Sequence, residues 1–179
     1  GKYPNILTDE VVGVEATKVF SDAQKMLQQI IDENWLTAKA VIGIWEANTI
    51  NDDTIELCEN GNKITQLHQL RQQGKKAKEA VNISLADFIA PKETGKTDYI
   101  GGFVVTTGHG IEEHIARFEA DHDDYNSIMI KALADRLAEA FAELMHQKVR
   151  KEYWGYANTE NLNNEDLINE SYKGIRPAP

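Results

Sequence analysis

Apolar side chains recur at steps of three and four residues in two stretches of the chain, which indicates two amphipathic helices. The first stretch covers residues 14–34, and the second, the strongest pattern in the sequence, covers residues 124–153. The second helix has an apolar face that carries Met129, Ile130, Leu133, Ala134, Leu137, Ala138, Phe141, Leu144 and Met145. Its opposite face carries Asp135, Glu139, Glu143 and His146. Pattern alone predicts that this polar face is solvated, with Arg136 placed to pair with Glu139.

Short runs with a β-type pattern lie between the two helices. Residues 41–45 and 54–58 are expected to pair across a turn-rich segment, residues 48–53. An Asn-Gly turn within residues 59–62 then leads to a third strand at residues 64–70. Strands joined by such short turns imply an antiparallel sheet.

A further strand and a helix are expected in the middle of the chain. Residues 98–106 fit a buried strand, in which Gly101 and Gly102 indicate a bulge or the close approach of another segment. The glycine-rich residues 106–110 precede a helix at residues 110–120. They could cradle a phosphate, but a strand-to-helix turn that needs glycine is the better interpretation, since the Walker and GxGxxG patterns are absent.

Two shorter helices complete the pattern. Ser84 and Asp87 have capping-box spacing and predict a short helix at residues 85–89, while residues 165–172 form another after a loop. Strands in a meander with helices at both ends predict an α+β fold. We expect one domain over residues 1–179, in which an antiparallel meander is flanked by helices.

Composition narrows the function classes. The net charge of −10 argues against general nucleic-acid binding, which needs a cationic face. No apolar run is long enough to span a bilayer. The single cysteine, Cys58, fits a reducing compartment such as the cytoplasm. Because the chain lacks an initial Met and stops abruptly, it is expected to be a fragment truncated at both ends.

Candidate chemistry is sparse. The spacing of His109, His114 and His122 matches no zinc-binding pattern, so no metal site is expected. The basic residues Lys148, Arg150 and Lys151 complement a helix dipole, or else form a docking patch for an acidic partner. The tail holds Arg176 between a glycine and two prolines, which suits a ligand that carries a carboxylate.

Several stretches together resemble one known family over almost the whole chain. They are residues 11–15, 70–73, 85–91, 98–102, 122–126, 131–143, 149–151, 153–156 and 174–179. The sequence resembles the activation domain of cobalamin-dependent methionine synthase, and the long-helix block and the arginine-proline tail are its most specific parts.

The resemblance implies a domain that binds S-adenosylmethionine at the C-terminal end of a methyltransferase. In that family the domain supports reductive remethylation of cob(II)alamin, with flavodoxin or a flavodoxin-like reductase as electron donor. Cobalamin and zinc belong to other domains of the parent enzyme, and the cobalamin-binding domain of the same polypeptide is a partner. Neither nucleic acid nor membrane is expected as a partner.

The resemblance also implies site residues. Arg176 matches the arginine that holds the methionyl carboxylate, Ala178 matches a backbone contact, and Glu139 matches an acidic residue near the ligand. The resemblance also favours a patch that faces flavodoxin, made of Lys148, Arg150 and Lys151. The family motif continues into Gly-Tyr, which this chain lacks, so the isolated fragment is expected to bind S-adenosylmethionine weakly or not at all and to be inactive.

Two other functions compete with this interpretation. The first is a non-catalytic module that only docks a corrinoid protein and a redox partner. The second, a stand-alone methyltransferase, is disfavoured because no glycine-rich Rossmann fingerprint follows a first strand.

Overall fold

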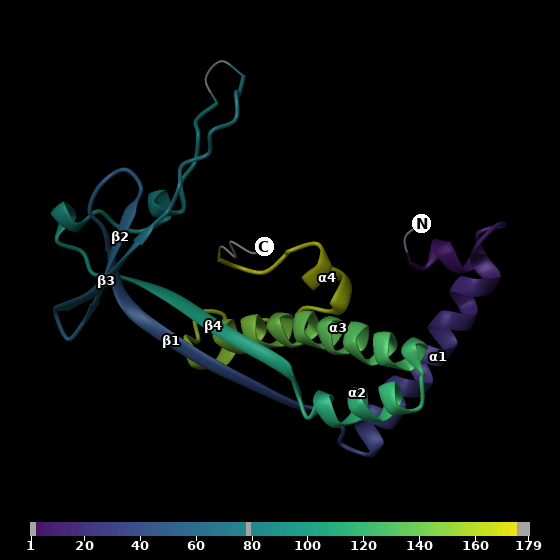
Figure 1. The fold of residues 1–179 in the computed structure, drawn as a ribbon. Coiled ribbons are helices and arrows are strands. Elements are labelled where there is room, and N and C mark those ends of the chain that lie inside the picture. Colours follow the sequence, from purple (N-terminus) through teal and green to yellow (C-terminus); the bar gives the residue numbers. More distant parts are fainter. Residues whose placement is uncertain (1–2, 78–79, 175–179) are drawn as a thin grey trace. The chain divides into compact units, whose positions relative to one another are not determined.

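The computed structural model describes residues 3–77 and 80–174, and the chain divides into two compact units. Unit 1 comprises Gly1–Val41 and Val104–Lys148, and unit 2 comprises Ile42–Phe103 and Val149–Pro179. The fold class is α+β, as the sequence predicts. Within the described ranges, the strands form one antiparallel sheet of four strands in the order β3-β2-β1-β4 (Figure 1).

The described part of unit 1 contains helices and a short 3-10 turn, together with one end of each of the strands β1 (Thr37–Thr49) and β4 (Asp98–His109). The helical elements are η1 (Asn5–Thr8), α1 (Gly13–Asp32), α2 (Ile111–Ala120) and α3 (Asp124–Lys148). The apolar faces of α1 and α3 meet in a core that contains Met26, Ile30, Trp35, Met129 and Ile130. The two long predicted helices are therefore confirmed, and burial of these apolar stripes stabilises them.

The predicted faces of α3 are only partly right. Ile130 is fully buried, as expected, but Leu144 is 45% exposed and His146 is 8% exposed. Buried positions near the end of the helix are thus rotated about its axis relative to those near Ile130. A periodic pattern assumes one packing face along the whole helix, and α3 has no such single face. The π-helical turn η4 (Val149–Tyr153) follows α3 directly.

The hairpin of unit 2 agrees with the sequence. Its strands are β2 (Thr54–Glu59) and β3 (Asn62–His68), and β2 also pairs with β1 (Thr37–Thr49). The pairing places Ala47 opposite Leu57 and Thr49 opposite Ile55. Three of these residues, Ala47, Ile55 and Leu57, join Ala86 in the core of unit 2.

Strand β4 (Asp98–His109) differs from the prediction of a buried strand. Within it only Thr107 is buried, at 6% exposed. The reason is its place at the edge of the sheet, because the sequence pattern cannot tell an edge strand from a central one. Of the predicted bulge or close approach, the close approach is present at Gly101. A Cβ on Gly101 would lie 3.2 Å from the ring of Trp154.

Short turns and helices join the remaining segments. The predicted helix at residues 85–89 is a 3-10 turn, η2 (Leu85–Phe88), and Ser84 and Asp87 form its capping box. The other elements are η3 (Lys92–Thr94) and α4 (Asn164–Ile168). Helix α4 ends earlier than residue 172, because Glu170 adopts a left-handed φ of 54°. Among the described residues, no helix combines the length and apolarity that crossing a membrane requires.

Candidate functional site

The predicted ligand residues fall in different parts of the chain. Arg176 and Ala178 lie outside the described residues. Glu139 lies on α3, where its side chain is 64% exposed and its Oε1 lies 2.7 Å from the Nη2 of Arg136. The expected i,i+3 ion pair is therefore present. Both carboxylate and guanidinium remain largely in solvent, so this pair stabilises the helix only slightly.

The segment that leads into the tail is held by contacts within unit 2. The guanidinium carbon of Arg150 lies 4.4 Å from the centre of the Tyr172 ring, which is cation–π geometry. The hydroxyl of Tyr156 donates a hydrogen bond of 3.2 Å to the carbonyl of Lys173. Gly174 has a φ of 98°, and a Cβ there would lie 2.6 Å from the Tyr156 oxygen. Residues 172–174 are thus fixed immediately before the predicted ligand-binding residues.

Arg150 is the most buried of the large side chains in this region. It is 1% exposed, and its Nε and Nη2 donate to the carboxylate of Glu160 at 2.9 and 2.7 Å. A fork of this kind satisfies the charge of a buried arginine. The prediction that Arg150 belongs to an exposed docking patch is therefore wrong. Arg150 follows the buried His146 by four residues, the spacing of one helix face, and the sequence pattern places His146 on the solvated face instead.

The two lysines of the basic cluster are placed differently. Lys148, at the end of α3, and Lys151, on η4, are both half-buried, so part of each side chain reaches solvent. Any docking role of this cluster therefore depends on Lys148 and Lys151 rather than on Arg150.

Aromatic side chains line the same part of unit 2. The rings of Trp154 and Tyr156 meet edge to face, with centroids 5.7 Å apart. Gly101 leaves room for Trp154 against β4. Burial raises the pKa of the Tyr156 hydroxyl, and the charge of Arg150 opposes that shift. The hydroxyl therefore stays protonated at neutral pH and can donate to Lys173.

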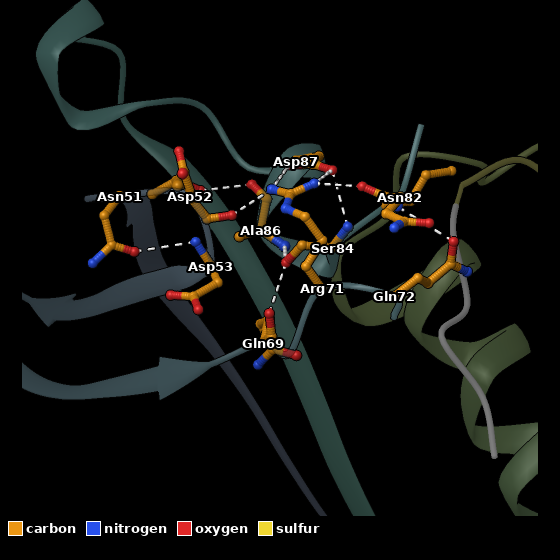
Figure 2. A network of polar contacts seen from close by, with 12 residues as sticks. Asn51, Asp52, Asp53, Gln69, Arg71, Gln72, Asn82, Ser84, Ala86 and Asp87 are labelled. Carbon is orange, nitrogen blue, oxygen red and sulfur yellow. Dashed lines mark hydrogen bonds and ion pairs between the residues drawn. The ribbon is translucent and has the colours of Figure 1, made fainter. Parts of the chain in front are cut away.

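A second polar centre of unit 2 is a network around Arg71 (Figure 2). Its Nη1 donates to the carbonyl of Asn82 at 2.8 Å and to Oδ2 of Asp87 at 2.7 Å. Its Nη2 donates to Oδ1 of Asp87 at 2.7 Å and to the carbonyl of Asp52. Arg71 and Asn82 lie near the two ends of the loop between β3 and η2. The contacts of Arg71 thus connect both ends of this loop with η2 and with the turn between β1 and β2. With these donors engaged, the network is a structural clamp rather than a ligand site.

The contact between Arg71 and Asp87 shifts the pKa values of both groups. The hydrogen bonds from Arg71, followed by the backbone N–H of Ser84, lower the pKa of Asp87 to about 2. The same contact with Asp87 raises the pKa of Arg71 above its ordinary value. Both groups therefore remain charged at every physiological pH.

The histidines and the cysteine do not gather into a centre. The ring of His114 stacks on Trp35, with centroids 4.3 Å apart. Cys58 is half-buried on β2, with its sulfur 4.0 Å from Oε1 of Glu56. Across the part of the chain that the structure describes, no group of three or more metal-ligating side chains is found.

The residues that hold the tail segment were not predicted from the sequence. Tyr156 is part of the motif at residues 153–156 and Tyr172 precedes the motif at residues 174–179, yet neither was given a role. Glu160 lies in a segment predicted only as a loop, and nothing in its spacing distinguishes it from other surface acids. The one available signal was an arginine among the lysines of the cluster, since arginine is the residue preferred for buried ion pairs.

The chain is similar to a known protein family and to a solved structure. The family described as "Vitamin B12 dependent methionine synthase, activation domain" matches residues 1–179. A solved structure described as "Crystal Structure of the MetH Reactivation Domain bound to AdoHcy" is 55% identical, with a TM-score of 0.89. The match covers 100% of this chain but 55% of that chain, so this chain spans about half the length of its relative. The chain therefore belongs to the family of vitamin B12-dependent methionine synthase activation domains.

Proposed function

We propose that this chain binds S-adenosylmethionine and serves reductive remethylation of cobalamin in a methionine synthase, a methyltransferase. The observation that carries the proposal is the solved relative, which is 55% identical over the whole of this chain and is bound to AdoHcy. AdoHcy is S-adenosylhomocysteine, the product that S-adenosylmethionine becomes when it loses its methyl group. The methionine synthase family to which the chain belongs supports the same assignment.

The residues proposed to hold the ligand are those that the resemblance implies. Arg176 offers two parallel N–H donors to the methionyl carboxylate, a geometry that lysine cannot supply. The backbone of Ala178 makes a further contact. Glu139, whose carboxylate is largely exposed and paired with Arg136, can offset the positive charge of the α-ammonium or the sulfonium.

The proposed chemistry needs one electron and one methyl cation. Cobalamin would be held by another domain of the enzyme, and zinc by a further one. With one electron from flavodoxin or a flavodoxin-like reductase, the reduced cobalamin would accept the methyl group from the sulfonium, and the electrons of the broken C–S bond would remain on sulfur as S-adenosylhomocysteine. This chain contributes the binding and orientation of the methyl donor.

Docking of the electron donor is proposed at Lys148 and Lys151. The chain as a whole carries a net charge of −10, so attraction to an acidic partner must come from a local patch. The double variant Lys148→Glu/Lys151→Glu should slow reductive activation at low salt, and added salt should shrink the difference. Equal rates at low salt would remove this part of the proposal.

The proposed function is tested by isothermal titration calorimetry of S-adenosylhomocysteine with the full-length protein that carries this sequence. Wild type should bind, and Arg176→Ala should weaken binding by about tenfold or more, equivalent to about 1.4 kcal/mol. Arg176→Lys keeps the charge but not the fork, and it should also weaken binding. An affinity of Arg176→Ala within about twofold of wild type would contradict the assignment. Absence of binding by wild type would instead favour a module that only docks partners.

A further inference from the structure

The chain just before the proposed ligand residues makes contacts at Tyr172 and Lys173 and packs closely at Gly174. The ring of Tyr172 lies on the guanidinium of Arg150, and the carbonyl of Lys173 accepts a hydrogen bond from Tyr156. Gly174 lies so close to Tyr156 that a Cβ would meet its oxygen at 2.6 Å. We call Arg150, Glu160, Tyr156 and Tyr172 the tail anchor.

Arg150 can serve as a rigid part of this anchor because its orientation is fixed. Two of its nitrogens are bound to Glu160, and the side chains of the two residues are 1% and 7% exposed. The backbone carbonyl of Arg150 also accepts a 2.9 Å hydrogen bond from the N–H of Ala157. A planar guanidinium held by its edge presents its face to an aromatic ring, whereas a lysine ammonium has no such face.

The tail anchor is separated from Arg176, the proposed ligand-binding residue, by only a few residues of backbone. Arg176 follows Gly174 by two residues, and consecutive Cα atoms of a trans chain are about 3.8 Å apart. Only Ile175 separates Gly174 from Arg176 in the sequence. A binding group that is restricted in advance loses less conformational entropy when it binds.

We infer that Arg150 is a positioning residue for S-adenosylmethionine, acting through Tyr172 on the backbone that carries Arg176. The inference rests on the proposed function. It differs from a purely structural role in one respect: weakening the anchor should lower ligand affinity only while Arg176 is present to bind.

Variants of Tyr172 and Gly174 test this better than variants of Arg150, since the loss of a buried arginine could prevent folding. Tyr172→Leu removes the aromatic face, whereas Tyr172→Phe keeps it. Gly174→Ala forces a Cβ toward Tyr156 at a φ of 98°, and Gly74→Ala is its matched control because no atom lies within 4 Å of that position. Each variant is made in the full-length protein, and S-adenosylhomocysteine binding is measured by calorimetry.

Tyr172→Leu and Gly174→Ala should each weaken affinity by about tenfold, while Tyr172→Phe and Gly74→Ala stay within about twofold of wild type. In an Arg176→Ala background, Tyr172→Leu should add less than about twofold, because coupled residues are not additive. An unaffected Tyr172→Leu, or an equal loss in both backgrounds, would overturn the inference while leaving the proposed function intact. Absence of binding by wild type would overturn the proposed function and this inference with it.

Discussion

The side chains of Arg150 and Glu160 form an ion pair that is almost completely removed from solvent. Nη2 of Arg150 lies 2.7 Å from Oε1 of Glu160, and the two side chains are 1% and 7% exposed. A second pair of the same chemistry, Arg136 with Glu139, has the same separation of 2.7 Å but is 69% and 64% exposed. The two pairs have the same shortest separation but differ strongly in burial.

Glu160→Gln should destabilise the fold strongly, because it leaves the charge of Arg150 buried without its carboxylate. We expect the free energy of unfolding to fall by about 3–5 kcal/mol, as measured by urea denaturation. The matched control Glu139→Gln should change it by about 1 kcal/mol at most. Similar small losses for both variants would mean that the Arg150–Glu160 pair is open to water in solution.

Ile130 should be among the most sensitive apolar positions of unit 1. It is 0% exposed, whereas Ile128 on the same helix is 67% exposed. Ile130→Ala should lower the free energy of unfolding by about 2–5 kcal/mol through lost burial and a residual cavity. Ile128→Ala should change it by about 0.5 kcal/mol or less. A larger loss at Ile128 than at Ile130 would contradict the assigned packing face.

Gly110 should not tolerate a side chain. Its φ is 98°, and a Cβ would lie 2.6 Å from the carbonyl oxygen of Trp35. Gly110→Ala should lower the melting temperature, with a cost of at least about 1–3 kcal/mol from the backbone strain. Gly108→Ala is the control, since that glycine has no neighbouring atom within 4 Å. Equal melting temperatures for the two variants would contradict the geometry of this turn.

The clamp between Arg71 and Asp87 predicts a specific response to acid. The pKa of Asp87 is lowered from 3.8 to about 2, chiefly by the hydrogen bonds from Arg71. A carboxyl with a lowered pKa contributes stability above its unfolded value of 3.8, and that contribution disappears as the pH falls toward 2. An NMR titration should give Asp87 a midpoint near 2 in the folded protein.

Arg71→Gln supplies the control for that titration. Without the guanidinium, the pKa of Asp87 should return toward 3.8, because the largest cause of its shift is gone. The loop that Arg71 closes should also become more sensitive to limited proteolysis. A midpoint for wild type at or above 3.8 would show that the clamp is not formed in solution.

Much of the fold could be predicted from the sequence, because local pattern and local burial agree there. The periodicity of α1 and α3, the hairpin of β2 and β3, and the capping box of Ser84 and Asp87 all depend on neighbours close in sequence. The predictions that were wrong depend on distant neighbours. The exposure of β4 follows from its edge position in the sheet. The burial of His146 follows from the change of buried face near the end of α3.

The predictions for the candidate site also differ according to whether they depend on residues close in sequence or on distant ones. Resemblance supplied Arg176, Ala178 and Glu139, whose roles remain proposals. The burial of Arg150 could not be predicted, since it depends on Glu160, ten residues away in the sequence. A cluster of basic residues is read as exposed by default, and only the fold shows that its arginine is buried while its lysines are half-buried.

The proposed function depends on binding of the S-adenosylmethionine carboxylate by the Arg176 guanidinium. A crystal structure of the full-length protein soaked with S-adenosylmethionine would show this contact or its absence. We expect two nitrogen–oxygen contacts of about 2.7–2.9 Å between Arg176 and the methionyl carboxylate. A well-ordered ligand with the Arg176 side chain directed into bulk solvent would contradict it.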